Sequence, residues 1–128
     1  MTDLLESGQN WLAGKLKTHA SREVVYLRGA SHIAVSATIG RTLLKLDDGY
    51  GGIRMEWTDR DFLIQAAEID FGGGPVSPER GDCIQDTVGS IVSTYEVTAY
   101  GGEPPFRPSD PFGIVLRIHT KCIEQESV

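Results

Sequence analysis

The sequence predicts a mainly β protein: a small antiparallel β-barrel or sandwich of six to seven strands with one N-terminal α-helix. Two observations predict this fold. Between residues 22 and 123, apolar side chains recur at every second position in short runs that end at Gly, Asp or Pro, a pattern typical of short antiparallel strands. Between residues 2 and 20 they recur at helical spacing instead. The 128 residues suffice for one core, so we expect a single domain over residues 1–128.

The helix expected over residues 2–20 begins at Thr2, whose hydroxyl can cap the first turn. Asp3 and Glu6 near its start and Lys15 and Lys17 near its end match the charges that a helix dipole favours. One apolar stripe would pack on the rest of the protein, formed by Leu4, Leu5, Trp11, Leu12 and Leu16.

The strands of the barrel, expected over residues 22–123, follow in order. Residues 32–39 alternate most clearly, and residues 53–57 do so with Ile53, Met55 and Trp57 on one face. Trp57 is interpreted as a core or rim aromatic. The strands expected are 24–28, 32–39, 42–46, 53–57, 62–69, 95–99 and 114–122. Closure into a barrel would hide the strand edges that otherwise invite aggregation.

Two long segments rich in Gly and Pro, residues 70–82 and 101–113, are predicted to be irregular loops. The first carries Phe71, and the second carries Phe106 and Phe112. An apolar side chain on such a loop either awaits a partner or folds back over the end of the barrel. Both interpretations remain open from the sequence.

The net charge of −6 and the sequence pI of about 4.9 disfavour a protein that grips nucleic acid. The charge is uneven, because residues 1–46 carry six basic and three acidic side chains, whereas residues 47–86 carry three basic and ten acidic ones. Two such regions can form opposite faces that meet between copies, or only a solvated acidic surface. No apolar run is long enough to span a membrane, and no secretory signal is recognisable. We therefore expect an intracellular chain with Cys83 and Cys122 as free thiols.

The sequence predicts no catalytic residue, no metal site and no cofactor. Gly72–Gly74 lacks the following helix and Lys-Ser/Thr pair of a phosphate loop. Arg80-Gly81-Asp82 is interpreted as a tight turn before a strand at Cys83 and Ile84. His19, His32 and His119 have no ligand spacing and are interpreted as structural. The carboxylates of Asp59, Asp61, Glu68 and Asp70 are expected on an exposed acidic strand face, with acid–base chemistry or Ca²⁺ binding as the alternative.

The order of several segments resembles that of the head–tail joining proteins of tailed phages, the connector or stopper group that includes the lambda-type joining protein. After the predicted helix come the stretch from Asp61 to Ile64, the stretch from Pro78 to Ile84, Ser93–Val97 and Leu116–Lys121. The resemblance implies a structural, non-enzymatic protein of the phage neck, located in the virion and, during assembly, in the host cytoplasm. It would form a homo-oligomeric ring between the portal or adaptor ring and the tail terminator or tail tube, with packaged DNA passing through.

Within that framework we expect the two loops to make the assembly contacts. The first loop would project into the channel or onto a neighbouring subunit through Phe71, Gly72, Gly73, Gly74 and Pro75. The second would meet an adjacent ring through Phe106, Arg107 and Phe112. Three alternatives remain: a tail-terminator or tail-completion protein, a small barrel that binds single-stranded nucleic acid, and an enzyme built on His119 or His32.

Overall fold

The computed structural model of the protein describes residues 21–47 and 49–127. The helix expected over residues 2–20 lies outside the described residues. Within them, nine strands form a seven-stranded sheet and a separate two-stranded sheet. The strands are β1 (Arg22–Arg28), β2 (Ser31–Gly40), β3 (Leu43–Asp47), β4 (Ile53–Trp57), β5 (Arg60–Gln65), β6 (Cys83–Val88), β7 (Ile91–Val97), β8 (Phe106–Pro108) and β9 (Val115–Ser127).

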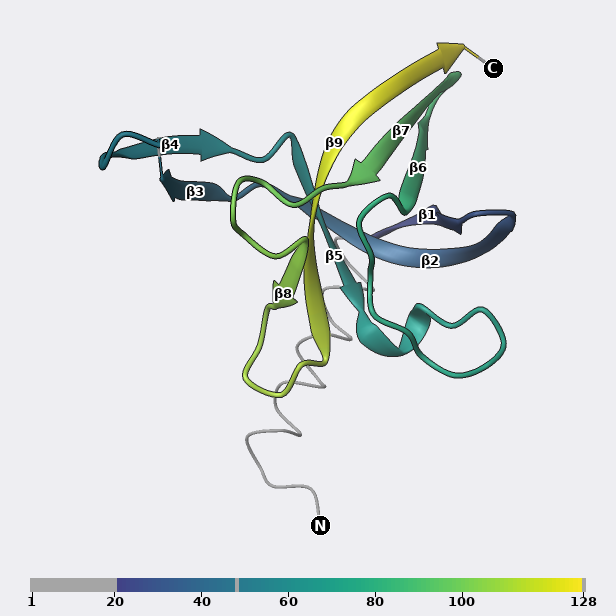
Figure 1. Ribbon diagram of the computed structural model, residues 1–128. Helices are drawn as coiled ribbons and strands as arrows, with labels where there is room; N and C mark the ends of the chain where they lie inside the picture. The colour runs from purple at the N-terminus through teal and green to yellow at the C-terminus, as the bar shows by residue number, and fades with distance from the viewer. Residues whose placement is uncertain (1–20, 48, 128) are drawn as a thin grey trace.

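The large sheet closes on itself and forms the expected antiparallel barrel (Figure 1). Its six wall strands pair in the order β5-β2-β1-β6-β7-β9, and β9 pairs back onto β5. Strand β9 closes the barrel because it is long: residues 115–120 pair with β5, and residues 120–127 pair with β7. The short strand β8 pairs with residues 116–118 of β9. The mainly β prediction is therefore confirmed.

The core fills the barrel with side chains from alternate positions of the wall strands. Tyr26, Phe62, Ile64, Ile84 and Ile118 are completely buried, and each contributes on the order of 2 kcal/mol through the apolar surface it removes from water. The predicted alternation of residues 32–39 is confirmed, since Val35 and Ala37 are buried and Ile33 and Ile39 pack beside them on the same face.

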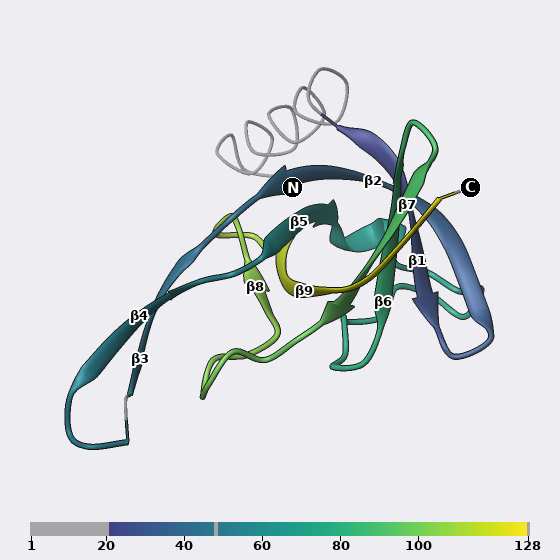
Figure 2. The same ribbon diagram turned by 90° about the horizontal axis from the view of Figure 1, so that it is seen from above.

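Two groups of strands extend beyond the barrel. The β3–β4 hairpin, here called the arm, continues β2 and β5 outward and pairs with no barrel strand (Figure 1). The ends of β6, β7 and β9 also run past the barrel, here called the tip, which carries Val88, Ile91, Ile123, Glu124 and Glu126. Viewed from above, the arm and the tip still extend from opposite sides of the barrel (Figure 2).

Several boundaries differ from the prediction; β7, for example, spans Ile91–Val97 instead of residues 95–99, and β9 continues to Ser127. The strand expected to run to Ile69 ends at Gln65, and a 3₁₀ helix, η1 (Ala66–Glu68), follows. The segment 101–113 is not wholly irregular, because it contains β8. The strand at Cys83 and Ile84 is confirmed and continues to Val88. Among the described residues, no helix has the length and apolar character needed to span a membrane.

Candidate assembly surface

The arm has one packed face and one open face, because its cross-strand register sorts side chains by alternation. On the packed side, Leu44 and Leu46 are buried together with Tyr100. Leu46 also lies over Gly101, where a Cβ atom added to the glycine would stand only 3.1 Å from Leu46 Cδ2. The arm is therefore held against residues 100–101 by one face only.

The open side, here called the arm outer face, consists of Leu43, Ile53, Met55 and Trp57. These side chains are 41%, 70%, 52% and 52% exposed, respectively. Among the described residues, every other large exposed apolar side chain also lies on a projection: Tyr50 at the end of the arm, Val76 and Phe112 on the loops, and Val88, Ile91 and Ile123 on the tip. The barrel wall carries none of them, so unburied apolar surface is concentrated on the parts that extend from it.

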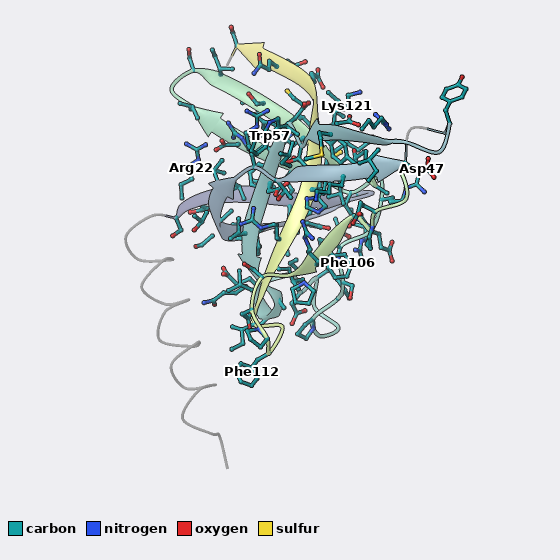
Figure 3. The ribbon with its side chains drawn as sticks, turned by 90° about the vertical axis from the view of Figure 1, so that its left-hand side faces the viewer. Arg22, Asp47, Trp57, Phe106, Phe112 and Lys121 are labelled. Atoms are coloured by element: carbon teal, nitrogen blue, oxygen red, sulfur yellow. The ribbon has the colours of Figure 1, made fainter. Side chains whose placement is uncertain are left out.

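Two cations accompany the arm outer face. The guanidinium carbon of Arg41 lies 5.3 Å from the centre of the Trp57 ring, in a cation–π contact. Lys45 stands directly across from Met55. Neither cation forms an ion pair with an acid among the described residues, whereas Arg54 pairs with Glu56 at 2.7 Å on the other side of the arm. The labelled Trp57 marks this surface in Figure 3.

A buried hydrogen-bond cluster fixes the root of the arm. The carboxylate of Asp61 accepts from Thr42 Oγ1, lies 3.0 Å from Arg117 Nη1 and lies 2.9 Å from His119 Nδ1. The Thr58 N–H donates to the Thr42 carbonyl at 2.9 Å, which joins the two strands where they leave the barrel. The cluster ties β2, β5 and β9 together at the point where the arm begins.

Burial alone would raise the pKa of Asp61. Hydrogen bonds from His119, Thr42, Thr58 and Arg117 outweigh burial and lower that pKa to about 2. Asp61 is therefore an ionised, fully enclosed carboxylate. The expectation of an exposed acidic strand face is wrong at Asp61, because Thr42 and Thr58 in the two joints and Arg117 and His119 on β9 surround the carboxylate and hydrogen-bond to it in place of water.

His119 is 1% exposed and its imidazole contacts Asp61. The interpretation of His119 as a satisfied structural histidine is confirmed. His32 is exposed on β2, and His19 lies outside the described residues. Within the described part of the chain, no three potential metal-binding side chains converge.

The first predicted contact loop, residues 70–82, lies partly against the barrel. Phe71 packs on the core, with its ring 6.1 Å from that of Tyr26 and 5.6 Å from the guanidinium of Arg28. The Asp70 carboxylate accepts the N–H groups of Gly72 and Gly74, so these amides already bind an anion. Gly72, Gly73 and Pro75 are exposed, while Phe71 and Gly74 are half-buried.

The same loop ends in the predicted Arg-Gly-Asp turn. Gly81 has a φ of +92°, which a glycine adopts without strain. Asp82 accepts a hydrogen bond from the Tyr26 hydroxyl, at 2.5 Å, and another from Arg28 Nη2, at 2.8 Å. Burial would raise the pKa of Asp82, but these donors and the Glu79 N–H lower it. The turn thus fastens the loop to β1.

The second predicted contact loop, residues 101–113, brings Phe106, Arg107 and Phe112 onto one segment. Phe106 is half-buried against the core within β8, Arg107 is exposed, and Phe112 is 38% exposed. Asp110 holds this loop in shape by accepting the N–H groups of Phe112, Ile114 and Val115. Figure 3 places Phe112 at the far end of the molecule from Trp57.

Sequence reasoning misses the arm outer face. The alternation of Ile53, Met55 and Trp57 is visible, but alternation shows only that one face is apolar and not what covers it. The sequence signal that could have indicated the arm is the hairpin itself: two short strands, the first with only weak alternation, flank the turn that begins at Asp47.

The fold and these surfaces define a small β-barrel protein whose large exposed apolar side chains, among the described residues, lie on projections. The particular family follows from comparison: a family model described as "Phage head-tail joining protein" matches residues 2–127, and the chain belongs to that family. No curated protein matches the chain. The family is structural rather than enzymatic. Membership gives the chain a phage head–tail joining role and makes it a component of the virion.

Proposed function

We propose that this protein is a ring-forming connector or stopper subunit of the phage neck. Copies would assemble beneath the portal or adaptor ring after packaging, retain the DNA and present a surface to the tail terminator or tail tube. The proposal specifies how the chain would perform the head–tail joining role of its family. The subunits would assemble in the host cytoplasm and remain in the virion.

The observation that carries the proposal is the division between a self-contained barrel and apolar projections. The barrel buries its own core, yet all large exposed apolar side chains among the described residues lie on the arm, the tip and the two loops. A subunit that contacts several neighbours at once needs separate contact surfaces on different sides. An isolated carrier or enzyme gains nothing from them.

The charges support a passive relation to DNA. Arg22 and Arg60 both pair with Asp86 at 2.6 Å, Arg28 pairs with Asp82, and Arg117 pairs with Asp61. These arginines are neutralised within the chain, so they offer little to phosphates. We therefore disfavour the small barrel that binds single-stranded nucleic acid, and weak binding of single-stranded DNA in a low-salt shift assay is the expected result.

The buried pair of His119 and Asp61 likewise supports a structural role. An acid–base enzyme must bring its imidazole to the substrate, but His119 and Asp61 are enclosed among strands β2, β5 and β9. Their contacts serve the root of the arm. We propose that no bond is made or broken by this protein.

An in vitro joining assay tests the proposal. Heads that lack this protein are incubated with purified protein and then with tails, and joined particles are counted by electron microscopy. We expect the protein to bind heads first and to be required for joining. Binding to isolated tails instead, with no binding to heads, would favour the tail-terminator or tail-completion alternative.

A further inference from the structure

The arm outer face requires a partner that covers apolar surface and also accepts positive charge. Leu43, Met55 and Trp57 are about half exposed, and Lys45 lies among them. Arg41 is already stacked on Trp57 and donates Nε–H to the Thr58 carbonyl, so it is held in place beside this surface. Asp47, across from Ile53, is the one acid on this face among the described residues, and Lys45 and Arg41 outnumber it. Apolar groups with this excess of cations indicate an acidic counterpart with some apolar surface.

The tip has an acidic face with some apolar surface beside it. Glu126 lies across from Val92, which is half-buried on the same face, and Ile123, 52% exposed, precedes Glu124. Val88 and Ile91, 57% and 47% exposed, instead face each other on the opposite side of the tip. Glu124 and Glu126 follow Ile123 on the same strand and project to one side of it. A hydrogen bond with Glu126 and the repulsion between the two carboxylates raise the pKa of Glu124, as expected for neighbouring acids without a cation between them.

The tip also has an open strand edge. Pairing of β9 with β5 stops at Thr120, whereas β7 covers the other edge of β9 as far as Ser127. The arm is likewise open, because β3 and β4 pair with no other strand in the described part of the chain. Open edges of this kind are sites where a second chain can add.

Within one chain the two surfaces cannot meet, since the arm and the tip extend from opposite sides of the barrel in both views (Figures 1 and 2). Two arms placed face to face would bring Lys45 and Arg41 of one copy against the same cations of the other. An arm-to-tip contact instead pairs opposite charges, and it repeats from copy to copy in one direction.

We propose that the arm outer face of one copy docks on the tip of the next copy, with Lys45 and Arg41 facing Glu124 and Glu126. This contact rests on the proposed ring and names the surfaces that would build it. The unlike surfaces make the contact heterologous, which is the type that closes into rings.

Charge reversal with mixing tests the proposal in the head–tail joining assay. One variant carries Lys45→Glu, and the other carries Glu124→Lys together with Glu126→Lys. In the first variant the new carboxylate faces Glu124 and Glu126 and only Arg41 still attracts them, and in the second two new ammonium groups face Lys45 and Arg41. We expect each variant alone to lose joined particles roughly tenfold or more. An equal mixture can alternate the two variants, so that every contact again pairs opposite charges, and we expect joining to recover.

Glu23→Lys, which reverses an exposed acid on β1, is the matched control and should join like the parent. The midpoint temperature of thermal unfolding is measured for each variant. We expect it to equal that of the parent protein, because the substituted side chains are exposed, and an equal midpoint shows that the fold is intact. If the single variants join normally, or if each fails and the mixture fails too, the arm-to-tip contact is wrong. Failure of the parent protein to join heads and tails would instead overturn the proposed function itself.

Discussion

Asp61 illustrates how a single carboxylate can set the geometry of a surface that it does not touch. It is fully buried, and its hydrogen-bond partners are Thr42, in the joint between β2 and β3, and Arg117 and His119 on β9, at the root of the arm. Removing its charge leaves Arg117 and His119 facing a neutral group in an enclosed site. Loss of this buried charge lowers the free energy of unfolding by more than an exposed ion pair contributes to it.

We expect Asp61→Asn to lower the free energy of unfolding by about 3 kcal/mol. Urea denaturation followed by circular dichroism measures this change. Glu79→Gln is the control, because Glu79 is 68% exposed and stands 3.9 Å from Arg28, and an exposed pair contributes at most about 1 kcal/mol. Equal stabilities of the two variants would contradict the role assigned to Asp61.

Acid should destabilise the protein in a defined pH range. The pKa of Asp61 is lowered from 3.8 to about 2, so the folded state releases this proton more readily than the unfolded state. Its contribution of about 2 kcal/mol is fully present above pH 4 and is lost as the pH falls towards 2. Unfolding curves between pH 5 and pH 2 should show this loss, and the slope should be shallower in Asp61→Asn.

At the scale of elements, the sequence predicts the barrel well and the projections poorly. Alternation identifies β2 and β9 because a barrel wall must bury one face of each strand. It also identifies residues 53–57 as a strand, but the face with Met55 and Trp57 is exposed. Periodicity depends on a strand's own side chains, whereas burial depends on partners elsewhere in the chain or on another chain.

The candidate contacts show the same limit. Phe71 and Phe106 are predicted contacts because they are apolar residues on Gly- and Pro-rich segments, yet both pack on the core. Phe112 and Arg107 are exposed as a contact surface requires. Loop composition predicts the absence of regular strands, but it carries no information on which way a side chain folds back.

Attachment of the arm to the barrel depends on Gly101, which has a φ of +57° and lies against Leu46. Gly101→Ala should lower the free energy of unfolding by about 1–2 kcal/mol, because a Cβ is disfavoured at this φ and presses on the Leu46 side chain. Gly102→Ala is the control, since no atom lies within 4 Å of its added Cβ. Chemical denaturation compares the two variants, and equal losses would refute this view of the attachment.

At the scale of the whole molecule, the arm, the tip and the two loops are expected to contact different partners. The arm and the tip lie on opposite sides of the barrel, and Phe112 lies at the far end from Trp57 (Figure 3). In the proposed ring, this arrangement would leave the second loop available for an adjacent ring while the arm and the tip contact neighbouring copies. The first loop, with Gly72, Gly73 and Pro75 exposed, stays a proposed contact to the channel or a neighbour.

We expect Arg107→Ala combined with Phe112→Ser to reduce joining of heads to tails severalfold while leaving unfolding nearly unchanged, because both side chains are largely in solvent. Particle counts by electron microscopy measure the effect. Val76→Ser is a matched control on the other loop, with a similar exposure of 37%. Normal joining by the double variant would argue against the second loop as a contact between rings.

The junction between barrel and arm has a mechanical consequence. β2 passes into β3 through Arg41 and Thr42, and β4 passes into β5 through Thr58 and Asp59, so neither joint has slack. A force on the outer end of the arm would be transmitted along the two backbone segments that join it to β2 and β5. Part of it would reach β9 through the hydrogen bonds of Asp61. We therefore expect the arm to transmit a load to the barrel wall as a rigid lever would, rather than to yield as a tether.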